Sequence, residues 1–391
     1  MKKFIALVMA AAMVFSLCAC GASESKAPAA SSSDEAVFKL GSTGPITGDA
    51  AIYGQAVMNA CKIAVDEINA AGGINGYKVE FKFEDDVADG ETAVNAYNTL
   101  MDWGMQILVG SVTSTPAAAV SAEAANDGIF VLTPSASSPK VIEGHTNVYQ
   151  MCFSDPNQGS ASAQYIAENK LSDKVAIIYQ NDDAYSTGIY EKFASEATAK
   201  GLNVVYTGTF TADSATDFSA QLTAAKAAGA DMLFLPIYYT PISLIMTQAD
   251  TMGYAVKYFG VDGMDGLLGV KNFNTALAEG AYLLTPFSAD ATDDKTVAFV
   301  KAYQEKYGDV PNQFAADAYD CIWAIYEACV AANVDPAKIS TTDLCAKMVE
   351  QFTSMTFNGL TGQGMTWGAT GEVSKSPMAV IIKDGVYTSV Q

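Results

Sequence analysis

The sequence contains no arginine, because all 22 of its basic residues are lysines. It has one histidine, His145, and no Cys-x-x-Cys pair after residue 20. Without a guanidinium group the protein has no bidentate clamp for a carboxylate or a phosphate. A Ser-His triad or a multi-histidine metal site would depend on His145 alone, and closely spaced cysteine ligands for zinc are missing. The most common catalytic and metal sites therefore lack their parts.

Positive charge is also scarce, since 43 acidic residues against 22 lysines give a net charge of −21. This balance argues against a nucleic-acid partner and against an anionic membrane surface, which both require a basic face. After the N-terminal region, no apolar run reaches the roughly 18 residues that cross a bilayer. Half of the residues are hydrophobic and 31 are glycine, within a length of 391. This composition and length predict a compact α/β protein of two domains.

Residues 1–19 have the pattern of a secretory signal, in which two lysines precede an apolar stretch and small residues follow. The sequence LCAC at 17–20 resembles the cleavage box of bacterial lipoproteins, in which Cys20 becomes the lipidated first residue. Residues 20–36 are small and polar, and they predict a tether. We therefore expect an extracytoplasmic protein, held at the cell membrane of a bacterium by its N-terminal lipid alone.

The cysteines after residue 20 do not form a disulfide framework, because their number is odd and their spacing is scattered. We expect most of them to be small buried hydrophobic residues, although one pair could bridge. They are Cys61, Cys152, Cys321, Cys329 and Cys345.

Strand and helix patterns alternate along the rest of the chain. The first series starts with a strand at 36–43 and a helix at 53–73, and a second series starts with a strand at residue 174. Two long helical patterns follow at 293–307 and 313–332. Strands separated by helices predict right-handed crossovers and parallel sheets. Two series predict two sheets, and hence two lobes.

Ligands of parallel α/β sheets bind beyond the carboxyl ends of the strands, so the loops at these ends are the candidates for a site. The loop 110–116 is rich in hydroxyl groups and precedes a helix that we expect to begin at Pro116. The unpaired N–H groups and the positive dipole end of this helix form an anion cradle that needs no cation. The loop 133–139 is similar. Either loop alone would be an ordinary cap or turn, but together they predict a carboxylate site.

The opposite charge comes from Asp262, which follows a short strand and lies in a glycine-rich loop. It is a candidate counter-ion for a ligand ammonium group, although an ordinary Asp-Gly turn is the alternative and Asp265 competes for the role. Four tyrosines at strand ends supply flat apolar faces with one hydroxyl each, unless they only pack in the core. An anion cradle opposite a carboxylate and tyrosines predicts a site for a zwitterion, such as an α-amino acid. The tyrosines are Tyr53, Tyr185, Tyr238 and Tyr239.

Motifs of catalysis are missing, since the sequence has no GxSxG, GxxxxGK[ST] or HExxH pattern. We expect neither an enzyme nor a bound cofactor or metal.

Four stretches resemble the substrate-binding lipoproteins of branched-chain amino acid ABC transporters, a family typified by the leucine/isoleucine/valine-binding protein. The resemblance covers essentially the whole chain after the signal. It implies a type I periplasmic-binding-protein fold, which is an α/β fold with two lobes, each a mainly parallel sheet flanked by helices, joined by three crossover segments. We expect residues 37–155 with 287–358 to form lobe 1, and 156–286 with 359–391 to form lobe 2. The stretches are GPITGDAAIYGQAVMNACKIAVDEINAAGGINGYKVEFKFEDD, GIFVLTPSASSP, DFSAQLTAAKAAGADMLFLP and QFAADAYDCIWAIYEA.

The resemblance also implies which residues contact the ligand. In this sequence Ser137 replaces a threonine of the family, and Asp262 replaces a glutamate that holds the ligand amine, one methylene shorter. Tyr53 matches an aromatic lining position. The implied contacts are Thr113 or Ser114, Ala136, Ser137, Tyr185, Tyr238 or Tyr239, Asp262 and Tyr53.

The function implied by the resemblance is that of a monomeric solute-binding component of an ABC importer. It would bind an amino acid, branched-chain or otherwise apolar, between its lobes and deliver it to the permease subunits. Members of this family also bind aromatic amino acids, amides and urea, and the same fold can serve as a ligand sensor. The sequence leaves these alternatives open.

Overall fold

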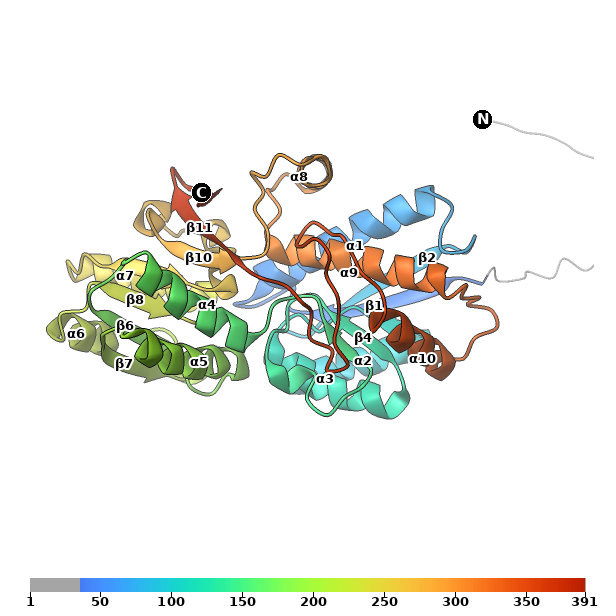
Figure 1. Ribbon diagram of the computed structural model, residues 1–391, viewed down its shortest axis with the longest axis horizontal. Coiled ribbons are helices and arrows are strands. Elements are labelled where there is room, and N and C mark those ends of the chain that lie inside the picture. The colour runs from blue at the N-terminus through green and yellow to red at the C-terminus, as the bar shows by residue number, and fades with distance from the viewer. Residues whose placement is uncertain (1–35, 391) are drawn as a thin grey trace, which may run out of the picture. The chain divides into compact units, whose positions relative to one another are not determined.

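The computed structural model describes residues 36–390, so the expected signal, most of the tether and Cys20 lie outside the described residues. Two sheets organise the described chain (Figure 1). The first sheet has the strand order β2-β1-β3-β4-β5, and all of its strands are parallel. Helices connect successive strands, as the alternation in the sequence predicts. The elements are β1 (Phe38–Gly44), α1 (Ala51–Ala70), β2 (Val79–Asp85), α2 (Gly90–Trp103), β3 (Ile107–Leu108), α3 (Ser114–Asp127), β4 (Phe130–Thr133) and β5 (Val148–Gln150).

The second sheet has the order β12-β11-β10-β9-β8-β6-β7. Strands β6 to β10 pair in parallel, and β11 and β12 add an antiparallel edge. Its elements are α4 (Asp155–Glu168), β6 (Val175–Gln180), α5 (Ala184–Lys200), β7 (Val204–Phe210), α6 (Ser219–Ala227), β8 (Met232–Leu235), α7 (Tyr239–Thr251), β9 (Lys257–Gly260), β10 (Tyr282–Thr285), β11 (Met378–Lys383) and β12 (Val386–Ser389). Short 3-10 turns complete it: η2 (Ala212–Ser214), η3 (Asp262–Met264), η4 (Leu267–Gly269) and η5 (Thr275–Ala278).

Three further helices return to the first sheet. They are α8 (Asp294–Tyr307), α9 (Gln313–Ala331) and α10 (Thr341–Phe352). Helices α8 and α9 pack on α1, and α10 packs on α9 and β4. The rings of Phe130 in β4 and Phe352 in α10 lie 4.9 Å apart. We call the first sheet with α1–α3 and α8–α10 the first lobe, and the second sheet with α4–α7 the second lobe. The 3-10 turn η1 (Pro139–Val141) belongs to the first lobe.

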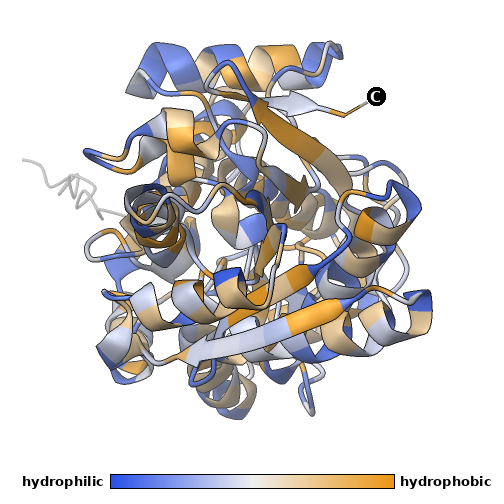
Figure 2. Cartoon of the chain, turned by 90° about the vertical axis from the view of Figure 1, so that its left-hand side faces the viewer, coloured by the Kyte–Doolittle hydropathy of each residue, from blue (hydrophilic) through white to orange (hydrophobic). Residues whose placement is uncertain are grey.

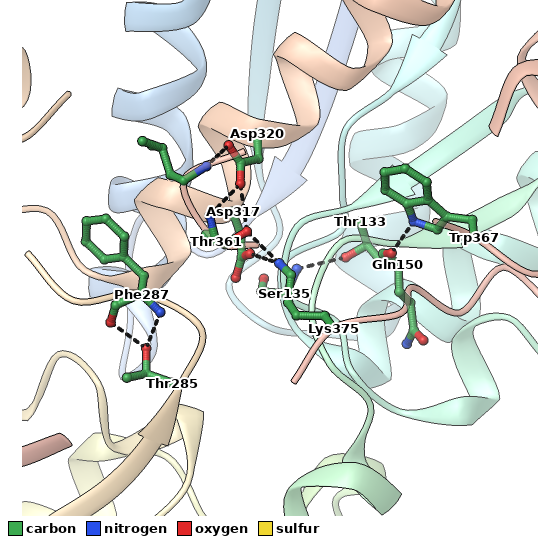
Figure 3. Close-up of polar contacts among 11 residues, drawn as sticks. Thr133, Ser135, Gln150, Thr285, Phe287, Asp317, Asp320, Thr361, Trp367 and Lys375 are labelled. Carbon is green, nitrogen blue, oxygen red and sulfur yellow. Dashed lines mark hydrogen bonds and ion pairs between the residues drawn. The ribbon is translucent and has the colours of Figure 1, made fainter. Parts of the chain in front are cut away.

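The chain passes between the lobes three times, as expected. It crosses after β5, after β10 and before β11, and the last crossing is the orange-red segment that runs from α10 to β11 in Figure 1. Residues 359–375, which we assigned to lobe 2, bond to the first lobe instead. Trp367 donates its indole N–H to the carbonyl oxygen of Gln150 at 2.8 Å, and Gly371 accepts from the Gln150 N–H (Figure 3). We therefore propose that the boundary lies near residue 376.

Helix α1 shows why these segments adopt their structures. Its apolar residues recur at helical spacing, and Val57, Cys61 and Ile68 are buried. The helix ends before Gly72-Gly73, and Gly73 has a φ of +78°. A Cβ atom at Gly73 would clash with the carbonyl oxygen of Tyr77, so only glycine permits this turn. Figure 2 shows the same separation of apolar and polar residues across the fold, with apolar strands between helices that carry hydrophilic residues.

Some elements were not foreseen. The sequence analysis found neither α4 nor α10, and it missed β5 and the β11-β12 hairpin. Helix α4 is rich in small and polar residues, which weakens the apolar periodicity on which such predictions depend. Strand β5 has three residues, which is too short to show a pattern.

All five cysteines of the described residues are free and buried, so no pair bridges. None of the helices in residues 36–390 combines the length and the apolar character that a membrane crossing requires.

Candidate functional site

A small cavity lies between the carboxyl ends of strands from both lobes. Its free space is about 10 Å³, room for about one water molecule, so a larger ligand requires the lobes or the lining side chains to move apart. Its position is the one that the rule for parallel sheets predicts. It is lined by Tyr53, Val112, Thr113, Ser114, Ser135, Tyr185, Tyr238, Asp262, Gly263 and Phe314.

One end of the cavity is formed by the start of α3. Thr113 is the N-cap residue, but its side chain makes no capping bond, and its buried hydroxyl has no partner. Ser114 is the first residue of the helix, two residues earlier than the predicted start at Pro116. Proline is tolerated within the first turn because no intrahelical bond is lost there. The N–H groups of Ser114 and Thr115 have no intrahelical acceptor, so they and the Thr113 hydroxyl can hold an anion.

The second hydroxyl-rich loop supports the first. Ser135 donates its hydroxyl to the carbonyl oxygen of Val112 at 2.6 Å, and this bond joins the two loops. Ala136 and Ser137 are fully buried but do not line the cavity. Their carbonyl oxygens accept bonds from the Gln150 side chain and the Asp155 N–H, respectively. The structure therefore brings Ser135 to the cavity, one residue before the implied contacts.

The other end of the cavity carries Asp262, the first residue of η3, which is 3% exposed. Its carboxylate accepts bonds from the Tyr185 hydroxyl and from Nε2 of Gln158, the latter at 2.9 Å. Burial raises the pKa of Asp262 to about 7, and these two hydrogen bonds offset part of the effect. A cationic group of a ligand would stabilise the ionised form.

Aromatic rings separate the two polar ends. Tyr185 and Tyr238 are stacked with their centroids 4.9 Å apart, and Tyr53 meets Tyr238 edge-on at 5.4 Å. Phe314, in the first turn of α9, lies 4.4 Å from Tyr53. These rings give the cavity an apolar wall that reaches from one lobe to the other.

Tyr239 does not line the cavity, so of the two adjacent tyrosines only Tyr238 does. The hydroxyl of Tyr239 accepts a bond from the N–H of Ile52 at 3.0 Å, and its ring lies 4.8 Å from that of Tyr53. Since Tyr239 belongs to α7 and Ile52 to α1, this residue connects the two lobes beside the cavity.

Four lining residues were not predicted from the sequence, and three of them had a signal that could have found them. Val112 and Ser135 lie in the two hydroxyl-rich loops, next to the residues that we named. Gly263 follows Asp262, and a Cβ atom there would lie 2.5 Å from the Tyr185 hydroxyl oxygen, so the site needs glycine. Phe314 had no such signal, because it follows no strand. Asp265, the competitor of Asp262, accepts from the Gln313 N–H at 2.9 Å and does not line the cavity.

No metal-binding arrangement was found in the part of the chain that the structure describes: no three His, Cys, Asp or Glu side chains there are placed to share an ion. The cavity itself offers hydrogen-bond donors at one end, a carboxylate at the other and aromatic rings between. This arrangement can bind a small molecule of matching polarity.

Comparison with known proteins agrees with the architecture. Residues 37–385 match the model of a family described as periplasmic binding protein. The chain is 32% identical to "Leu/Ile/Val-binding protein homolog 3" of Brucella melitensis over 58% of its length, and it spans 61% of that relative. It is 27% identical to the "Leucine-, isoleucine-, valine-, threonine-, and alanine-binding protein" of Pseudomonas aeruginosa over 78% of this chain and 81% of the relative.

Among solved structures, the branched-chain amino acid transporter substrate-binding protein LivJ of Streptococcus pneumoniae, in complex with isoleucine, is similar with a TM-score of 0.82. The two sequences are 28% identical, and the match covers 90% of this chain and 98% of LivJ. The fold is therefore the type I periplasmic-binding-protein fold that the sequence predicted. The chain belongs to the periplasmic binding protein family, and the proteins to which it is similar include binding proteins for branched-chain amino acids.

Proposed function

We propose that the protein binds an α-amino acid with an apolar side chain, such as leucine, isoleucine or valine, and delivers it to the permease of an ABC importer. The observation that carries this proposal is the polarity of the cavity. The unpaired Thr113 hydroxyl and the start of α3 lie at one end, and the buried Asp262 lies at the other. A zwitterion has the complementary charges. Because the site has no arginine, the start of α3 must hold the carboxylate and Asp262 must hold the ammonium group.

Each part of an amino acid has a corresponding surface. The carboxylate would accept from the backbone N–H groups of Ser114 and Thr115 and from the Thr113 hydroxyl. The ammonium group would donate to Asp262. The apolar side chain would pack against the aromatic rings and Val112, which line the cavity between the polar ends.

Closure of the lobes over the ligand is supported by bonds around the cavity. The Thr115 hydroxyl donates to Asp183, the N-cap residue of α5, at 3.2 Å, and the Thr240 hydroxyl of α7 donates to the Asp49 carbonyl oxygen at 2.7 Å. These contacts join the lobes on different sides and would break in an open form. A permease that recognises the closed form would distinguish the loaded protein from the empty one.

Location and assembly complete the proposal. We infer that the protein works outside the cytoplasm as a monomer, anchored by a lipid on Cys20, and that it carries no catalytic activity. The lipid anchor is inferred from the N-terminal sequence, since Cys20 lies outside the described residues. The other features are inferred from the family.

Isothermal titration of the purified protein against the common amino acids tests the proposal. The protein is unfolded and refolded first, so that any ligand carried through purification is removed. We expect binding of one or more branched-chain amino acids with micromolar affinity, about 8 kcal/mol, and none of their des-amino analogues. Binding of urea or a short amide, with silence from every amino acid, would contradict the proposal and leave the fold intact.

A further inference from the structure

Gln158 is a fully buried glutamine whose side-chain amide is bonded to a single residue, Asp262. It is the fourth residue of α4, the helix that follows the first crossing between the lobes (Figure 1). Its Nε2 donates to Oδ2 of Asp262 at 2.9 Å, and its Oε1 accepts from the backbone N–H of Asp262 at 3.2 Å. A buried amide costs free energy unless its polar atoms are bonded. Here both of them are bonded to the residue that we assign to the ligand amine.

These two bonds fix the direction of the amide, and with it the role of the carboxylate. A backbone N–H only donates, so the amide atom that faces it must be Oε1. The atom that faces the carboxylate of Asp262 must then be Nε2, which also only donates. Oδ2 of Asp262 is therefore held as a hydrogen-bond acceptor.

Tyr185 holds the other carboxylate oxygen in the same way. Its hydroxyl accepts from the N–H of Gly263 at 2.8 Å and donates to Oδ1 of Asp262. Both oxygens thus accept a bond, which favours the ionised carboxylate. A carboxylate has about four acceptor sites on its two oxygens, so sites remain for a further donor. Since Asp262 lines the cavity, these sites can serve a ligand bound there.

We propose that Gln158 is a positioning residue of the amine site: its amide fixes the Asp262 carboxylate as a hydrogen-bond acceptor for the ammonium group of the ligand. The inference rests on the proposed function, since it assumes an amino acid as the ligand. Gln158 does not line the cavity, so it acts through Asp262. Both α4 and η3 belong to the second lobe, so the two bonds need no contact between the lobes. The carboxylate is therefore oriented before the lobes close, and the cost of ordering it does not reduce the affinity.

The amide also opposes the effect of burial on Asp262. Burial raises the pKa of this carboxyl to about 7, and the bonds from Tyr185 and Gln158 keep it from rising further. Without Gln158 the pKa of Asp262 should rise, because a donor to the ionised form is lost. An ammonium group binds the ionised form, so the pH that leucine binding requires should rise as well.

Other titratable groups surround Asp262, but the Gln158 amide is bonded to none of them. Burial raises the pKa of each, and the tyrosines and the cysteine therefore stay neutral near pH 7. The other carboxyls should titrate alike with and without the amide, so a difference between two pH profiles reports Asp262. These groups are Tyr53, Tyr185, Tyr238, Cys152, Asp155 of α4, Asp183 at the start of α5, Asp265, and Asp317 of α9, which is paired with Lys375.

Isothermal titration with leucine between pH 5 and 9, on the refolded protein, tests the inference. Gln158→Met keeps the length of the side chain and removes both bonds. We expect it to raise the pH at which the association constant is half its maximum by about one unit, and to weaken binding at pH 7 about fivefold or more. Gln164→Met is the matched control and should leave the profile unchanged, because Gln164 lies in the same helix but donates to Glu196 at 3.3 Å.

A double variant shows whether Gln158 acts through Asp262. In a protein that already carries Asp262→Asn, the change Gln158→Met should reduce the affinity for leucine much less than it does in the unaltered protein. The reason is that the carboxylate positioned by the amide is gone. An equal loss in both backgrounds would overturn the inference.

The outcomes separate this inference from the proposed function. If the unaltered protein binds no amino acid, the proposed function fails and the role of Gln158 fails with it. If the unaltered protein binds leucine, but Gln158→Met binds it equally well or weakens it equally at every pH, only the role of Gln158 is overturned.

A second substitution covers the case in which Gln158→Met does not fold. Gln158→Ala removes the amide without placing an apolar chain beside the carboxylate, and it should raise the pH of half-maximal association in the same direction. An unchanged value would overturn the inference. Failure of both variants to fold, while Asp262→Asn folds, would show that the amide serves the structure rather than Asp262, and would overturn it as well.

Discussion

Tyr53 of α1 and Tyr239 of α7 are bonded to each other across the two lobes. The backbone N–H of Tyr239 donates to the Tyr53 hydroxyl oxygen at 3.2 Å, and the Tyr53 hydroxyl donates to the carbonyl oxygen of Gly263. Only Tyr53 also lines the cavity. The pair therefore couples the shape of the cavity to the contact between the lobes, and part of the energy of closure comes from groups that do not touch the ligand.

Tyr239→Phe should shorten the lifetime of the complex. The change removes the acceptor for the N–H of Ile52 and keeps the ring against Tyr53, so it weakens the closed form while the cavity wall stays. Loss of one hydrogen bond of about 1 kcal/mol predicts a dissociation rate about fivefold higher. Stopped-flow fluorescence measures the rate. The control is Tyr258→Phe, which alters a buried tyrosine whose hydroxyl makes no hydrogen bond within residues 36–390. An unchanged dissociation rate with a slower association rate would contradict the role of Tyr239 in closure.

Asp262→Asn should weaken the binding of amino acids by about one to two orders of magnitude, the worth of a charge-assisted hydrogen bond. Asparagine keeps the volume of the side chain and a partner for Tyr185, so the cavity should keep its shape. Titration calorimetry measures the affinity, and a thermal melt checks the fold. An Asp262→Asn protein that binds leucine as well as the unaltered one would remove Asp262 from the amine site.

The candidate site was predictable to the extent that it depends on local sequence. Ser114 and Asp262 were found because helix starts and strand ends lie at fixed places in parallel α/β folds. Phe314 could not be found in this way, because it reaches the cavity from a helix that packs on α1 through contacts distant in sequence. The same holds for the partner of Lys375, Asp317, which lies 58 residues away in the chain.

Affinity for amino acids should depend on pH around neutrality. Asp262 has a pKa of about 7 in the buried site, so it is protonated below that pH and ionised above it. An ammonium ligand requires the ionised form of Asp262, so below pH 7 its binding must displace one proton. Each pH unit below 7 should therefore reduce the affinity about tenfold. Titrations between pH 5 and 8 test this, with Asp262→Asn as the control that should flatten this dependence. A constant affinity in the unaltered protein across this range would contradict the raised pKa.

The stability of the unliganded protein should fall as pH rises from about 4 to 7. Burial raises the pKa of Asp86 to about 7 and that of Asp265 to about 6, from an ordinary value of 3.8. Carboxyls with raised values bind more protons in the folded than in the unfolded state over this window. The stability that these carboxyls contribute is thus fully present below their pKa in the unfolded state, and it is lost as the pH rises through their pKa in the folded state. Melting temperatures at pH 5 and pH 8 measure the effect, which Asp86→Asn should reduce; a higher melting temperature at pH 8 would contradict it.

Lys375 lies in the last crossing and forms a fully buried ion pair with Asp317 of α9 (Figure 3). Its ammonium group also donates to the Thr361 hydroxyl at 2.6 Å, and that hydroxyl donates in turn to Asp320. These bonds attach the last crossing to the first lobe. Removal of the lysine leaves the carboxylate of Asp317 buried without its cation.

Lys375→Met should therefore lower the free energy of unfolding by about 3–5 kcal/mol, the usual cost of breaking a buried ion pair from one side. The double change Lys375→Met with Asp317→Leu removes both charges and should recover most of the loss, because apolar residues of similar volume often replace buried pairs without cost. Urea unfolding of the unaltered protein, of each single variant and of the double variant gives the coupling between the two positions. As a surface control, Lys301→Met breaks an exposed pair with Glu305 and should change stability by less than about 1 kcal/mol. If the double variant is as unstable as the single one, the pair is not what holds the crossing, and the bonds of Thr361 to Asp320 would have to hold it instead.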